Sequence, residues 1–143
     1  MNKDIEKKVV QAFFVKQKQE RVLYELNRPW EKRTNLLETI EARNLLDSRY
    51  VHEIPKAMHS IDQINAILKK HGAPKECYVI SGGGEYDEYD GKEVFVLDAL
   101  EYNFGQGAFF LSCIHGELAY FEGHKKINGS ERYLLKRHGN KEV

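Results

Sequence analysis

The sequence predicts an α+β fold in which an N-terminal helical hairpin and a third helix pack on a mainly antiparallel sheet of three to five strands. Three observations favour it. Helical spacing dominates the first half of the chain, short β-rich runs dominate the second half, and one of these runs has a hairpin pattern. With 143 residues, 41% of them hydrophobic, the chain is predicted to form a single domain, residues 1–143. Within it, residues 1–47 form the hairpin and residues 48–143 the helix and sheet region.

The N-terminal region predicts two helices joined by a short turn. Over Asp4–Leu26, apolar residues recur at helical spacing without proline or glycine. Asn27 and Pro29 are then typical of a new helix start. The apolar stripe over Trp30–Asp47 predicts the second helix, so we expect the two to pack as an αα-hairpin.

A third helix is predicted to begin after Ser60. Ser60 and Gln63 have the spacing of a capping box, and the helical pattern ends at Gly72. Asp98 and Glu101 have the same spacing and predict a further short helix. A crossover through this helix could make one pair of strands parallel.

The strongest strand signal is the segment Ala108–Glu122, in which two apolar runs flank His115-Gly116. Such a dipeptide between β-rich runs is typical of a tight hairpin. The pairs expected across it are Phe110 with Phe121, Leu111 with Tyr120, Ser112 with Ala119, Cys113 with Leu118, and Ile114 with Glu117. Both faces of the first strand are apolar, so we expect this hairpin at the centre of the core. The other β-rich runs are Cys77–Ile80, Val94–Leu97 and Glu131–Lys136, with a short extended piece near residues 50–54.

Charge is balanced overall but unevenly distributed. The chain holds 22 basic and 22 acidic residues, so there is no global attraction to nucleic acid or to an anionic membrane. Residues 1–76 carry a net charge of +4, residues 81–122 of −8 and residues 124–138 of +4. The basic segments could contact nucleic acid, but acidic residues are interleaved in the helices as on an ordinary solvated face. We therefore rank nucleic acid below a protein partner.

Several features favour a cytoplasmic location without a membrane partner. No apolar run approaches the roughly 20 residues that cross a bilayer, and the N-terminus is charged where a signal peptide is apolar. Cys77 and Cys113 lack metal-ligand spacing and are predicted to be buried, reduced thiols. The histidines show no zinc-site spacing, so we predict neither a metal site nor a cofactor.

The candidate binding site is an acidic loop that contains tyrosines. The preceding glycines, Gly82–Gly84, could cradle a phosphate, but the acidic residues that follow would repel an anion, and their spacing matches an EF-hand poorly. A solvated loop of this kind suits a partner protein with a basic patch, because aromatic side chains supply contact area at low entropic cost. We expect the loop to contribute little to folding. The candidate residues are Glu85, Tyr86, Asp87, Glu88, Tyr89 and Asp90.

The sharpest enzymatic hypothesis is a nucleophile and base formed by Cys113 and His115, which are two residues apart. Against it, His115 is expected in a turn, thiols in apolar strands are usually inert, and no third residue can be assigned. No catalytic residue is therefore predicted. The sequence favours a non-catalytic protein-binding or regulatory module. The alternatives are a small hydrolase or transferase whose residues are scattered in the sequence, and a nucleic-acid-binding regulator.

Overall fold

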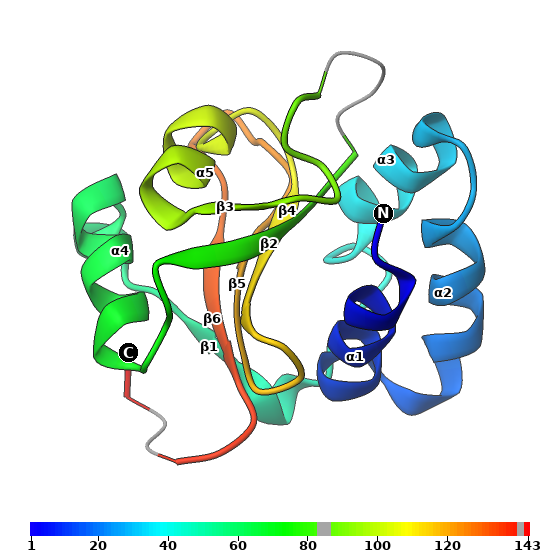
Figure 1. Cartoon of the computed structure of the whole chain (residues 1–143), viewed down its shortest axis with the longest axis horizontal. Coiled ribbons are helices and arrows are strands. Elements are labelled where there is room, and N and C mark those ends of the chain that lie inside the picture. Colours follow the sequence, from blue (N-terminus) through cyan, green and yellow to red (C-terminus); the bar gives the residue numbers. More distant parts are fainter. Residues whose placement is uncertain (83–86, 140–141) are drawn as a thin grey trace.

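A single sheet separates two groups of helices (Figure 1). The computed structural model describes residues 1–82, 87–139 and 142–143. In these ranges six strands pair in the order β1-β6-β5-β4-β2-β3, and every neighbouring pair is antiparallel. The α+β class is confirmed. The strands are β1 (Val51–Glu53), β2 (Glu76–Ser81), β3 (Glu93–Phe95), β4 (Phe109–Ile114), β5 (Leu118–Glu122) and β6 (Arg132–Lys136).

The helices cover both faces of the sheet. Figure 1 shows α1, α2 and α3 on one side and α4 and α5 on the other. The helices are α1 (Lys3–Phe13), α2 (Gln19–Leu26), α3 (Trp30–Thr39), α4 (Ile61–Lys70) and α5 (Val96–Asn103). Because side chains alternate along a strand, Phe110 packs in the core beneath α1–α3, whereas Phe109 and Leu111 pack in the core beneath α4 and α5.

The predicted two-helix hairpin is wrong in detail, because the N-terminal region forms three helices. The chain leaves the helical conformation at Phe14, which pairs with Leu46 in an isolated β-bridge, and the amide of Val15 donates to the carbonyl of Leu45 at 2.8 Å. The polar stretch after residue 15 has no apolar face that would hold one continuous helix over this bridge. The helix from Trp30 also ends earlier than expected, at Thr39.

The sheet has six strands in the described part of the chain, instead of the expected three to five. The edge strands β1 and β3 have three residues each. Strand β1 forms where only a short extended piece is expected, near residues 50–54, and β3 is shorter than the expected run Val94–Leu97 because α5 begins at Val96. Helix α5 begins at Val96, so Asp98 and Glu101 lie inside the helix and do not form a capping box. No described strand pair is parallel.

The central hairpin is confirmed over most of its length. Three of the expected pairs are present: Phe110 with Phe121, Leu111 with Tyr120, and Ser112 with Ala119. Beyond them an irregularity at Cys113 shifts the register, so that Ile114 faces Leu118 and the last two expected pairs are wrong. The loop therefore has three residues, with Gly116 at φ +83°. Glycine adopts this left-handed conformation at little cost, which explains its place in the loop.

Candidate functional site

The acidic loop between β2 and β3 is organised by Asp87. Its Oδ1 accepts hydrogen bonds from the amides of Tyr89 and Asp90 at 2.9 and 3.1 Å, and its Oδ2 accepts from the hydroxyl of Ser81 at 2.6 Å. All three donors are neutral, so the negative charge of Asp87 is held in place without being compensated by them. Glu88 is exposed beside it. Of the other candidate residues, Glu85 and Tyr86 lie outside the described residues.

Asp90 differs from the solvated residue that we expected. Its carboxylate accepts from Nη2 and Nε of Arg33 at 2.9 and 3.1 Å and from the amide of Ser81 at 2.9 Å. The expectation that the loop is wholly solvated is wrong here, because Arg33 on α3 supplies a buried cation for Asp90. Burial raises the pKa of Asp90 above its ordinary value, although the ion pair with Arg33 acts in the opposite direction.

The same arginine binds a second carboxylate, that of Glu6 on α1. Nη1 and Nη2 donate to Oε1 and Oε2 of Glu6 at 2.8 and 2.9 Å, and the hydroxyl of Tyr78 donates to Oε2 at 2.7 Å. Burial by itself lowers the pKa of Arg33. The hydrogen bonds and negative charges of Glu6 and Asp90 together outweigh burial, so the pKa lies above its ordinary value and the guanidinium stays charged. One cation thus faces two carboxylates, and the cluster keeps a negative charge beneath the loop.

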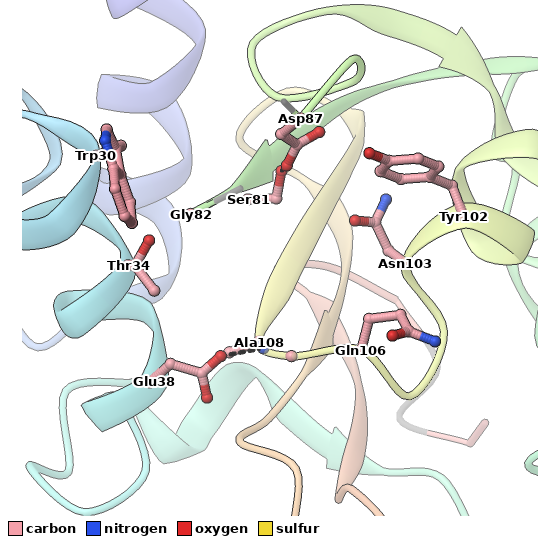
Figure 2. A pocket seen from close by; sticks show the side chains of 11 residues that line it. Trp30, Thr34, Glu38, Ser81, Gly82, Asp87, Tyr102, Asn103, Gln106 and Ala108 are labelled. Carbon is pink, nitrogen blue, oxygen red and sulfur yellow. Dashed lines mark hydrogen bonds between the residues drawn. The ribbon is translucent and has the colours of Figure 1, made fainter. Parts of the chain in front are cut away.

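A pocket of about 490 Å³ opens beside this loop (Figure 2). Helix α3 forms one wall, the end of α5 and the turn after it form the opposite wall, and the ends of β2 and β4 meet between them. Its volume lies within the range of ordinary ligand sites. The lining residues are Trp30, Thr34, Glu38, Ser81, Gly82, Asp87, Tyr102, Asn103, Gln106, Gly107 and Ala108.

The pocket is rich in hydrogen-bond acceptors. Glu38 and Asp87 line it, and among the described residues no lysine or arginine does. Glu38 is fixed by the amide of Ala108, which donates to Oε1 at 2.8 Å, and by Nδ1 of His124, which contacts Oε2. Figure 2 shows the amide oxygen of Asn103 directed into the pocket between the two walls. Such a lining disfavours an anion and suits a ligand that carries N–H donors.

Two aromatic side chains stand on opposite sides of the pocket. Trp30 on α3 is 51% exposed, and Tyr102 on α5 is 42% exposed. The ring of Tyr102 also packs on that of Tyr89, with 4.5 Å between the centroids, which connects the acidic loop to α5. Exposed aromatic rings beside carboxylates favour a cationic or planar ligand.

The floor of the pocket depends on a close approach between α3 and the end of β2. A Cβ atom at Gly82 would lie 2.6 Å from the Cα of Thr34 and 2.3 Å from its Oγ1, so only glycine fits there. That hydroxyl oxygen is buried and has no hydrogen-bond partner among the residues that the structure describes.

The structure does not bring Cys113 and His115 together as a nucleophile and base. His115 Nδ1 lies 2.7 Å from Ser112 Oγ, and Nε2 lies 3.4 Å from a carboxylate oxygen of Glu93. Ser112 is fully buried, so a substrate could not reach its hydroxyl. The thiol of Cys113 is instead near Cys77: a hydrogen bond between the two thiols, together with burial, raises the pKa of Cys113, which disfavours the reactive thiolate.

The described residues contain no metal-binding group and no membrane-spanning helix. Within them, no group of three or more histidine, cysteine or carboxylate side chains could hold a metal ion. No helix in these ranges is long and apolar enough to cross a membrane.

No protein-family model, curated protein or solved structure matches the chain. Its fold and pocket thus define an α+β protein with an acidic, aromatic-walled surface site.

Sequence reasoning found one edge of this site and missed the rest. The sequence pattern places Trp30 in the apolar stripe of a helix, but half of its surface is exposed at the pocket. Glu38, Tyr102 and Asn103 carried no local signal, because they approach Asp87 only through the tertiary fold. One feature of the sequence could have indicated Trp30 as a site residue. It is the single tryptophan of the sequence, and it begins a helix that is otherwise largely polar.

Proposed function

We propose that this chain is a non-catalytic protein-binding module that recognises a positively charged segment of a partner protein. The observation that carries the proposal is the pocket beside Asp87, which combines carboxylates with exposed aromatic rings and, among the described residues, is lined by no basic side chain. Opposite charges across an interface accelerate encounter and select partners, while aromatic side chains supply contact area.

The surrounding charge supports the same proposal. Residues 81–122 carry a net charge of −8, which includes Asp90, and Arg33 is shared between Asp90 and the carboxylate of Glu6. A partner with a basic patch would relieve this repulsion on binding. The proposal includes a cytoplasmic location, which the two free, buried cysteines support because a reducing compartment keeps thiols unpaired.

The experiment is capture of a partner at low salt by the immobilised chain from an extract of its own cells. The test variant carries Asp87→Asn and Glu88→Gln, and the control carries Glu20→Gln and Asp62→Asn, which remove the same charge at exposed positions on α2 and α4. The partner should be released by salt, be retained by the control and be lost by the test variant, and cross-links from the loop should reach a basic segment.

Two results would count against the proposal. Retention of the partner by both variants with no dependence on salt would place the interface elsewhere. Recovery of nucleic acid in place of a protein would favour a nucleic-acid-binding regulator. Recovery of a small metabolite would favour a small hydrolase or transferase.

A further inference from the structure

We infer that the pocket between α3 and α5 binds one arginine side chain of the partner, with the guanidinium held by Asp87 and Asn103 against the ring of Tyr102. This inference rests on the proposed function and names the group that the site recognises. It begins with the composition of the pocket, which offers carboxylate, amide and hydroxyl oxygens and no cationic donor among the described residues.

A guanidinium matches this lining better than other groups. It carries five N–H donors and no acceptor. It can therefore donate to several oxygens of the pocket, and it places no acceptor of its own against them. Its charge is permanent and complements Asp87, whose carboxylate is fixed by Ser81, Tyr89 and the amide of Asp90 before any ligand arrives. A preorganised acceptor loses little entropy on binding.

The aromatic wall distinguishes arginine from lysine. A planar guanidinium stacks on an aromatic face, whereas an ammonium is a compact, strongly hydrated charge. In Figure 2, Tyr102 and Asn103 lie on the same side of the pocket and near Asp87, so stacking and hydrogen bonding can act on one group. Trp30 on the opposite wall is placed to contact the peptide that carries the arginine.

The size of the site supports a side chain attached to a polypeptide. A volume of about 490 Å³ exceeds the needs of a guanidinium alone and leaves room for the stem of the arginine and its neighbours.

Trp30 provides the readout, because it is the only tryptophan of the sequence and lines the pocket. The probe is a short glycine–serine peptide with one central arginine and blocked ends, and the comparison peptides carry citrulline or lysine there. Citrulline keeps the shape of arginine without its charge. The arginine peptide should change the fluorescence of Trp30 and, by calorimetry, bind at least about tenfold more tightly than the citrulline peptide, with the lysine peptide weaker than the arginine peptide.

Matched variants test the residues. Asp87→Asn keeps the Oδ1 acceptor of the turn and should weaken the arginine peptide by about tenfold, whereas Asp98→Asn, an exposed aspartate on α5 outside this pocket, should not. Tyr102→Leu should weaken binding about threefold, and Tyr24→Leu, another exposed tyrosine, should leave it unchanged. If Asp87→Asn does not fold, Tyr102→Leu carries the test.

The outcomes separate this inference from the proposed function. Equal affinity for the arginine and citrulline peptides, or binding that none of the pocket variants alters, would overturn the arginine site, while partner capture that still depends on Asp87 and Glu88 would leave the binding function standing. Free arginine that binds as tightly as the peptide would also overturn it in favour of a small-molecule site. If the arginine peptide binds but the immobilised chain captures no partner protein, the proposed function is overturned. The inference that the arginine belongs to a partner protein is then overturned as well.

Discussion

Arg33 and Asp90 form a bidentate ion pair between α3 and the loop that follows β2. Nε and Nη2 of the guanidinium donate to Oδ2 and Oδ1 at 3.1 and 2.9 Å. The side chains of Arg33 and Asp90 are only 2% and 8% exposed. Because α3 carries one wall of the pocket and the loop carries Asp87, this pair fixes the two parts of the site relative to each other.

The first prediction concerns the removal of this cation. Arg33→Met should lower the free energy of unfolding by about 3–5 kcal/mol, because the carboxylates of Glu6 and Asp90 would remain buried without a counter-ion. Urea denaturation followed by circular dichroism measures the effect. A variant that also carries Glu6→Gln and Asp90→Asn should recover part of the loss, since it no longer buries uncompensated charge.

Arg49 provides the matched control for this prediction. It pairs with Asp47 through two side-chain hydrogen bonds, but its side chain is largely exposed. Arg49→Met should therefore lower the free energy of unfolding far less than Arg33→Met does, because an ion pair exposed to water contributes little to stability. Similar small effects at Arg33 and Arg49 would show that the buried cluster does not hold the N-terminal helices.

The parts of the fold that sequence predicts well are those with local signals. The capping box of Ser60 and Gln63 is present at the start of α4, and the hairpin pairs near Phe110 follow from the glycine turn and the alternation of side chains. Arg33 gave no such signal. Its partners lie 27 and 57 residues away in the sequence, so an arginine on a polar helix face was indistinguishable from a solvated one.

The candidate site was predictable only as a loop. The density of acidic residues drew attention to residues 85–90, but the sequence could not separate Asp90, which is buried by Arg33, from Asp87, which lines the pocket. The expectation that the loop contributes little to folding therefore does not extend to Asp90, whose carboxylate pairs with the buried Arg33. Tertiary contact decides which charges of such a cluster support the fold and which are available to a ligand.

The second prediction tests the central hairpin as the core. Phe110 is buried and stacks on Phe121, with 4.5 Å between the ring centroids. Its ring also packs on that of Phe14, from the loop after α1, with 5.8 Å between the centroids. Phe110→Ala should reduce the free energy of unfolding by about 3–5 kcal/mol, because it removes a buried ring and leaves a cavity. Ile127→Ala, at a fully exposed position, should change it by less than about 0.5 kcal/mol. Comparable urea midpoints for both variants would place the hairpin at the periphery.

The third prediction is a loss of stability in alkaline solution. Burial raises the pKa of Tyr78 and Tyr120 above the ordinary value, with a further rise from the carboxylates of Glu6 and Glu122. The folded chain therefore keeps these protons at a pH where the unfolded chain, whose tyrosines ionise near about pH 10, has lost them. The free energy of unfolding should be unaffected by these groups below about pH 10 and fall above it, by up to about 1.4 kcal/mol per pH unit for each tyrosine.

Urea denaturation between about pH 9 and pH 11 measures this slope, and the absorbance of tyrosinate monitors ionisation directly. Tyr78→Phe should reduce stability at neutral pH, because its hydrogen bond to Glu6 is lost, yet flatten the alkaline decline. Tyr24→Phe, at an exposed position, should alter neither. A decline as steep in Tyr78→Phe as in the unchanged protein would exclude Tyr78 as a cause.

The last prediction concerns the two thiols. Cys77 and Cys113 are free and buried on the side of the sheet covered by α4 and α5. The pKa of Cys113 is raised by its hydrogen bond with Cys77 and by burial, so the thiolate that reacts with a disulfide reagent is scarce in the folded state. Labelling should therefore require opening of the structure, and its rate should rise when the fold is destabilised. Phe110→Ala should accelerate labelling of both cysteines, whereas an added exposed thiol, Ile127→Cys, should react at once in every background. Rapid labelling of Cys113 in the folded, unchanged protein would contradict this account and would return Cys113 to consideration as a nucleophile.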